Sequence, residues 1–194
     1  MKTLSSQKLN QLKELGTRIM DHHAARIIVP PLGNSSGYWF GGGNLILDHN
    51  GDILVSGRFR NEGDARTGTG SGERGLECAI FRGLEPSSSF EKVFSLSKDQ
   101  LSFDHEVVSI EGVSLLPSFR SSSEYDLYVS TEKNIPYPKH LIHFQKPGTG
   151  VWSIDHVSLT DSFSEPNAGS ITPVASTQNP GSLHIKDPLA FRLD

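Results

Sequence analysis

Hydrophobic and polar residues follow two different patterns along the chain, and the change falls near residue 26. In the first part, apolar side chains recur three and four positions apart: Leu9, Leu12, Leu15 and Ile19. This spacing predicts an amphipathic helix, which Ser5 or Ser6 can cap. We expect its apolar face to pack against its own domain, as in ordinary surface helices. An anchor for a partner is the alternative.

After residue 26, short apolar runs alternate with turn residues, a pattern typical of β-strands. The first set of runs lies at 45–47, 53–55, 78–81 and 93–94, the second at 113–116, 125–129 and 151–154, and a third begins with Leu183–Phe191. Asn50-Gly51 marks a tight hairpin in the first set. The sequence therefore predicts a mainly β protein with a short N-terminal helix.

The sets read as a loose repeat in which a buried strand follows a polar turn. Four-stranded sheets repeated around an axis form a β-propeller. We expect a helical segment, 1–26, and a partial β-propeller domain, 27–194. Its four-stranded blades are expected at about 38–100 and 105–175, with a third starting at about 182–194. A β-sandwich of irregular strands is the alternative.

The number of sets also bears on what covers the sheets. A propeller closes with roughly four to eight blades, whereas about two and a half are present. We therefore expect either that copies associate to cover the open edge or that further blades are missing. The chain ends at Asp194 within an apparent strand, which favours a fragment of a longer protein.

Composition narrows the class of function. The chain has 194 residues, with 18 Lys and Arg against 22 Asp and Glu, a net charge of −4. This balance gives no footprint for nucleic acid or an anionic membrane. No apolar run approaches the ~20 residues of a membrane helix. The N-terminus lacks a secretory signal, so we expect a cytoplasmic protein. The single Cys and the spacing of the histidines predict no metal site, and we expect no cofactor.

The segment Arg58–Glu77 concentrates arginines, acids and glycines. Its G-x-G-x-x-G pattern precedes a strand rather than a helix, so it is not a dinucleotide fingerprint. Arg58 and Arg60 share one face of a strand. They need acids between them, for which Asp64 and Glu77 are available, or a hydroxyl-rich or anionic ligand. We favour a ligand site.

Two acids stand where strands begin: Glu111 opens the second set, and Asp187 precedes Pro188 in the third. Capping of nearby backbone is the ordinary role of such acids. Because the position recurs one set later, we expect both carboxylates to meet at a common axis. Paired carboxylates are the machinery of glycoside cleavage.

At these residues the sequence resembles the five-bladed β-propeller glycosidases, the group of arabinanases, β-xylosidases, invertases and levansucrases. The resemblance rests on Ile185-Lys186-Asp187-Pro188-Leu189-Ala190-Phe191 and on the blade-like strands from about Gly41 onward. It implies that Asp187 is a transition-state stabiliser. In the family the first blade opens with an Asp nucleophile or base, whereas Gly43 or Asn44 stands there in this chain. Neither can act as a base.

The resulting hypothesis is a glycoside hydrolase-like domain that binds a carbohydrate at the propeller centre. Cleavage of this carbohydrate by the strand-entry carboxylates is the further part of the hypothesis. Glu111 and Asp187 are the predicted catalytic acids. The predicted substrate-binding residues are Asn44, Arg58, Arg60, Glu132, Lys133 and Trp39. Glu132 and Lys133 match Arg58 and Arg60 by position in the second set. Trp39 offers an aromatic face for a sugar, as does Trp152, although buried aromatics are more often core. The alternatives are a non-catalytic carbohydrate-binding or interaction propeller, and an anion-binding β-sandwich that uses the Arg-rich loop.

Overall fold

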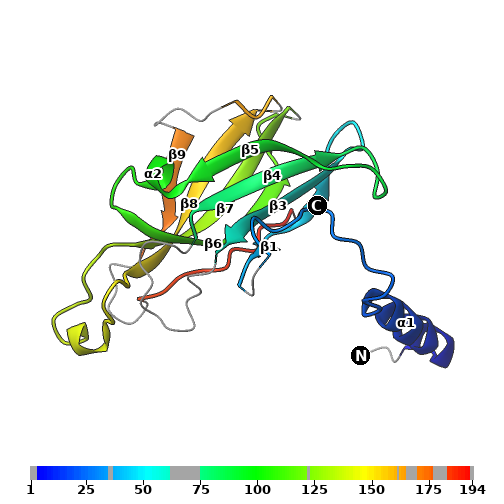
Figure 1. Ribbon diagram of the computed structural model, residues 1–194, viewed down its shortest axis with the longest axis horizontal. Coiled ribbons are helices and arrows are strands. Elements are labelled where there is room, and N and C mark those ends of the chain that lie inside the picture. The colour runs from blue at the N-terminus through cyan, green and yellow to red at the C-terminus, as the bar shows by residue number, and fades with distance from the viewer. Residues whose placement is uncertain are drawn as a thin grey trace.

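The computed structural model describes residues 4–34, 37–61, 75–121, 123–160, 162–164, 170–176 and 183–192. These residues form two antiparallel sheets, with a helix at the N-terminal end (Figure 1). The predicted mainly β class with a short N-terminal helix is confirmed. The Asp64 part of the Arg-rich loop lies outside the described residues.

The first sheet is built from the strands between Trp39 and Ser97. They are β1 (Trp39–Gly41), β2 (Leu45–Leu47), β3 (Ile53–Arg60), β4 (Glu77–Gly83) and β5 (Glu91–Ser97). The order is β1-β3-β4-β5, and β2 also pairs with β3. The turn between β2 and β3 forms where Asn50-Gly51 predicts it: Asp48 Oδ1 accepts from the Asn50 and Asp52 amides, and Gly51 has a φ of 88°.

The second sheet has the order β6-β7-β8-β9. Its strands are β6 (Val107–Pro117), β7 (Glu124–Lys133), β8 (Val151–Thr160) and β9 (Ile171–Ala175). The short helix α2 (Lys98–Leu101) joins the sheets and begins at a capping box of Ser97 and Gln100. A 3-10 helix, η2 (Ile142–Phe144), lies in the connection from β7 to β8. Strands β1–β5 fall within the range expected for a first blade, and β6–β9 within that of a second.

One apolar core joins the facing sides of the two sheets. Its fully buried members include Leu54, Ile80, Leu96, Leu101, Ile110, Leu115, Leu127 and Val129. A smaller cluster of Val29, Phe59, Ala79 and Phe81 lies on the other side of the first sheet. Facing sheets occur both in sandwiches and between neighbouring blades. The propeller-like interpretation therefore depends on where the segments that open each set meet.

The N-terminal helix α1 (Ser6–Ile19) forms as predicted, with Ser5 as its N-cap: the Ser5 Oγ accepts from the Lys8 amide. Its packing differs from the expectation. Leu9, Leu12 and Leu15 are 45–52% exposed, and the helix has no buried residue. Figure 1 shows α1 away from the sheets. The expected contact with its own domain is wrong, because periodicity identifies an apolar face but not what covers it.

The expected third strand is also wrong over the described residues 183–192. Only His184 forms a β-bridge, with Trp152 of β8. The chain then leaves the strand conformation because Asp187 has a φ of 58° and precedes Pro188, which cannot donate a backbone hydrogen bond.

The segment 183–192 instead crosses the second sheet, as the red trace of Figure 1 shows. The Ile185 amide donates to the Trp152 carbonyl, and the Ala190 amide to the Ser114 Oγ. The segment therefore passes from β8 to β6. No helix formed by the described residues is long and apolar enough to cross a membrane.

Candidate functional site

The free edge of β6 meets the segment that opens the first sheet. The Val113 amide donates to the Gly42 carbonyl at 2.8 Å. The Asn44 amide group then pairs with Leu115 as a backbone peptide would: Nδ2 donates to the Leu115 carbonyl and Oδ1 accepts from the Leu115 amide, both at 2.8 Å. Asn44 Oδ1 also accepts from the Ser56 hydroxyl. These contacts cover an edge that would otherwise expose unpaired backbone groups.

Asn44 therefore joins the two sheets. The sequence places it at a strand opening, where a sugar contact is the expectation. In the structure the amide oxygen accepts two hydrogen bonds and the amide nitrogen donates one. We assign Asn44 to the fold rather than to a ligand.

A buried ion pair lies beside this junction. The Arg58 guanidinium on β3 donates to the Glu111 carboxylate on β6, and their side chains are 7% and 12% exposed. The acid that meets Arg58 thus comes from the other sheet. Glu77, one of the two acids that the sequence makes available, pairs with Lys92 at 2.8 Å.

Trp39 lies next to this ion pair. The Arg58 and Arg60 guanidinium carbons are 5.0 and 5.7 Å from the centre of the Trp39 ring. The ring also packs along β1, since a Cβ built on Gly41 would come within 3.1 Å of it. Trp39 is 39% exposed. It is therefore a fixed aromatic surface that still meets solvent.

A bulge in β6 sets the direction of Glu111. Ile110 pairs with Thr131 and Val113 with Val129, so three steps along β6 match two along β7. Ile110 and Val113 both point into the core, and the extra residue falls at Glu111-Gly112. A bulge of this kind redirects side chains and is frequent near active sites. It explains how Glu111 leaves the core side and reaches Arg58.

Asp187 lies against this bulge. A Cβ built on Gly112 would be 3.2 Å from Asp187 Oδ1 and 3.5 Å from the Gly42 carbonyl oxygen. The openings of all three predicted sets therefore lie side by side at Gly112. The Asp187 side chain is 63% exposed and lies 3.7 Å from the Lys186 ammonium. This adjacency supports the propeller-like arrangement, whereas the roles of Glu111 and Asp187 stay predictions.

Glu132 and Lys133 lie on opposite faces of β7, as neighbours in a strand must. Lys133 is buried on the core side, where its ammonium contacts Asp155 at 3.0 Å and Asp104 at 2.7 Å. Only Glu132, which pairs across the strands with Ser109, lies on the face that carries Glu111. Of the two, Glu132 alone is placed to accompany Glu111.

The Lys133 cluster is a structural charge network. Burial raises the pKa of Asp155, and the neighbouring Lys133 charge offsets only part of that effect. For Asp104 burial acts in the same direction, but the Lys133 ammonium and the hydrogen bonds from His105 together lower the pKa. The network closes the end of the core with paired charges. The described residues contain no cluster of acidic, His and Cys side chains able to hold a metal.

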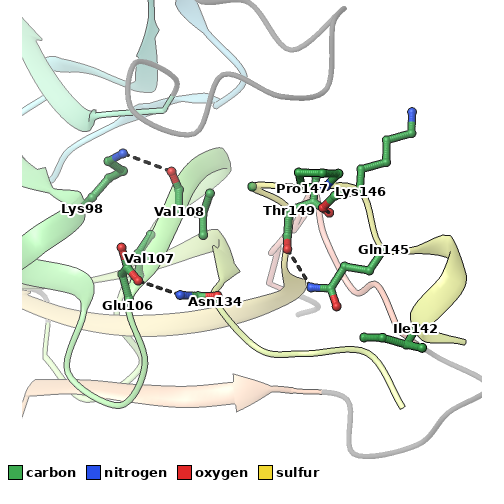
Figure 2. A pocket seen from close by; sticks show the side chains of 11 residues that line it. Lys98, Glu106, Val107, Val108, Asn134, Ile142, Gln145, Lys146, Pro147 and Thr149 are labelled. Atoms are coloured by element: carbon green, nitrogen blue, oxygen red, sulfur yellow. Dashed lines mark hydrogen bonds between the residues drawn. The ribbon is translucent and has the colours of Figure 1, made fainter. Parts of the chain in front are cut away.

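A cavity of about 740 Å³ has none of the predicted site residues in its lining. Figure 2 shows it between the start of β6 and the loop that follows Ile142. Lys98 donates to the Val108 carbonyl, and Asn134 Nδ2 donates to Glu106 at 2.7 Å. These groups are already paired with each other across its walls. Sequence patterns gave no signal for this cavity because its lining comes from four separate segments.

Comparison with known proteins gives a partial structural likeness. No protein-family model matches the chain, and no curated protein matches its sequence. Two solved chains match in structure. One is described as "Crystal structure of the GH43_1 enzyme from Xanthomonas citri complexed with xylotriose", with 10% identity and a TM-score of 0.45. The match covers 74% of this chain and 37% of that one, so the chain spans little more than a third of the neighbour's length. An overlap at this level identifies no equivalent residues.

Proposed function

We propose that the protein binds a neutral carbohydrate where the three opening segments meet. The observation that carries this proposal is the position of Asp187. Its exposed carboxylate lies against Gly112, the residue that directly follows Glu111 in the chain. The segment that leads from Trp39 lies beside the same glycine. Aromatic side chains stack on the apolar faces of sugar rings, and carboxylates accept hydrogen bonds from sugar hydroxyls.

The site suits binding better than it suits proton transfer. Glu111 shares its charge with Arg58 in a buried ion pair, so donating a proton to a leaving group would require a different state of that pair. Asp187 is free to meet a ligand from solvent. We therefore assign hydroxyl recognition to Asp187, stacking on the sugar ring to Trp39, and the positioning of the β6 bulge to the Arg58–Glu111 pair.

Glycoside cleavage is the second candidate function. The observation that favours it is the presence of two carboxylates on adjacent segments, Glu111 on β6 and Asp187 in the segment 183–192 that lies against it. Both retaining and inverting mechanisms use such a pair. In this alternative Asp187 stabilises the transition state and Glu111 supplies the second carboxylate.

Isothermal titration calorimetry with xylo-, arabino- and cello-oligosaccharides tests the proposal. We expect saturable binding that Asp187→Asn weakens about fivefold, since the amide loses the charge-assisted part of the hydrogen bonds. Asp99→Asn, a change of the same kind in the first turn of α2, is the matched control. Binding of phosphate esters but of no saccharide would instead favour the anion-binding alternative and contradict the proposal.

Release of reducing sugar separates binding from cleavage. Turnover that is lost in Asp187→Asn while binding persists establishes the second candidate function. Binding without turnover in the unmodified protein leaves the first. The domain division at residue 26, and the association of copies or further blades that cover the open edge, remain proposals alongside it.

A further inference from the structure

We propose that a second pocket, at the ends of β7 and β8, binds one sugar unit of a neutral saccharide. Its volume is about 250 Å³. Its lining includes Glu132, Tyr137, Phe144, Lys146, Trp152 and His184. It is distinct from the site at Gly112, and none of its aromatic residues contributes to that site.

The loop between β7 and β8 is held in place around this pocket. Gln145 acts as an internal brace: its Oε1 accepts from the Tyr137 amide at 2.9 Å, and its Nε2 donates to the Thr149 and Ile135 carbonyls. Thr149 in turn donates its hydroxyl to the Lys146 carbonyl at 2.7 Å. The walls that this loop supplies are therefore fixed before any ligand arrives, which lowers the cost of binding.

Aromatic side chains from three segments form the walls. Trp152 is the second residue of β8 and forms a β-bridge with His184. The Tyr137 hydroxyl lies 3.1 Å from His184 Nε2, and the two rings meet edge to face at 5.6 Å. Phe144 is 66% exposed, and the centre of its ring lies 4.0 Å from that of His143. Rings of this kind suit the apolar faces of a sugar.

Polar groups in the same pocket can both donate and accept hydrogen bonds. The Glu132 carboxylate is held by the Gly150 amide, which donates to Oε1 at 2.7 Å. Tyr137 and Lys146 supply donors. His184 supplies either role, because burial and the charge of Lys186 lower its pKa and keep the ring neutral near pH 7. A set of mixed donors and acceptors matches hydroxyl groups.

Charge separates a sugar from the other ligands that aromatic walls attract. An aromatic pocket with a carboxylate also suits a quaternary ammonium ion. Here Lys146 lines the pocket, and the Lys186 ammonium already lies 5.3 Å from the centre of the Trp152 ring. These two positive charges oppose a cationic ligand, and Glu132 opposes an anionic one. A neutral, hydroxyl-rich ligand meets neither obstacle.

The pocket lies on the same face as the site at Gly112. Glu132 pairs across the strands with Ser109, and Ser109 Oγ contacts Glu111 Oε1 at 3.4 Å. The two carboxylates therefore flank Ser109. We assign the pocket to a neighbouring unit of the same saccharide. This inference rests on the proposed function for the ligand class, whereas the pocket itself rests on its own residues.

The chain has two tryptophans, one in each site, so fluorescence can report on the sites separately. Trp39→Phe leaves Trp152 as the reporter of the pocket, and Trp152→Phe leaves Trp39 as the reporter of the site at Gly112. Each folded variant, checked by circular dichroism, is titrated with xylose, xylotriose, choline chloride and inorganic phosphate. We expect xylotriose to change Trp152 emission in a saturable way, and choline and phosphate to leave it unchanged.

A second variant tests the pocket while keeping Trp152 as the reporter. In the Trp39→Phe background, Tyr137→Phe removes the hydroxyl that contacts His184, and we expect it to weaken xylotriose binding about fivefold. Tyr128→Phe is the matched control, because Tyr128 also lies against a histidine, His156, at 5.2 Å but outside the pocket. Equal affinities in the two variants would overturn the assignment.

The outcomes distinguish the two proposals. A response of Trp39 with a silent Trp152 overturns the pocket and leaves the proposed function intact. A response of Trp152 with a silent Trp39 supports the pocket and contradicts the site at Gly112. A response of Trp152 to choline alone, or to no saccharide at all, overturns the neutral sugar as its ligand.

Discussion

Removing the charge of Glu111 tests whether its ion pair with Arg58 holds the β6 bulge against the first sheet. Both side chains are largely buried, 12% and 7% exposed. Removing one partner of a buried pair costs about 3–5 kcal/mol, because the other charge stays buried without compensation. Since part of Glu111 meets solvent, we expect the lower end, about 3 kcal/mol, for Glu111→Gln. In a domain of this size that is a fall in Tm of roughly 6–12 °C.

Urea unfolding followed by circular dichroism measures the effect in a double-mutant cycle. The set comprises the unmodified protein, Glu111→Gln, Arg58→Met and the double variant. We expect the double variant to lose less than the sum of the single losses, because the contact between the two residues is then lost only once. Arg60→Met is the control: it removes a cation–π contact with Trp39, worth about 0.5–1 kcal/mol, and leaves the ion pair in place.

Two results would refute this reasoning. Single variants within about 0.5 kcal/mol of the unmodified protein would match ordinary surface substitutions and contradict a buried pair. A double variant that loses the full sum would show that Arg58 and Glu111 act independently, so the contact between them would not join the sheets.

Three further outcomes follow from the geometry. Gly112→Ala must displace Asp187, because the Asp187 Oδ1 lies 3.2 Å from the position of the new Cβ. We expect the saccharide affinity to fall while Tm falls by less than about 4 °C. An unchanged affinity would argue against a role of Asp187 in binding. Burial raises the pKa of Cys78, the single cysteine, to about 12, so a disulfide reagent at pH 8 should label it only after unfolding, and rapid labelling of the native protein would count against this. Burial and the charge of Lys186 lower the pKa of His184 below its ordinary value of 6.5. As the pH falls below 6.5, the unfolded chain therefore binds a proton at His184 more readily than the folded protein, and the folded state loses stability. An NMR titration midpoint of His184 above 6.5 would contradict this assignment.

The regular elements were predictable because local patterns determine them. The Leu spacing and Ser5 gave α1 and its cap, and Asn50-Gly51 gave the hairpin between β2 and β3. What covers α1 could not be predicted, because the spacing of apolar residues in a helix is the same whether its apolar face is packed or exposed. The apolar run after Asp187 also reads as a strand, but the left-handed backbone of Asp187 prevents it from pairing.

The candidate site was predictable in its residues and less so in its contacts. The alternation along β3 placed Arg58 and Arg60 on one face, and the contacts of both with Trp39 agree with that. The sequence offers Asp64 and Glu77 as nearby acids and favours a ligand for the arginines, since nothing in it shows that Glu111 of another sheet comes near Arg58. Glu132 and Lys133 are neighbours in one strand, so alternation alone puts them on opposite faces. Which of the two shares the face of Glu111 depends on how β6 and β7 pair, a tertiary feature that the sequence does not show. The pocket around Tyr137 and Trp152 was missed for the same reason.

Nuclear magnetic resonance of the ¹⁵N-labelled protein during titration with xylo-oligosaccharides measures directly whether sugars bind where the opening segments meet. The account predicts that the Trp39 indole signal and the amide signals of Gly112 and Asp187 shift together and saturate together. Saturating saccharide that leaves all three signals in place would contradict it.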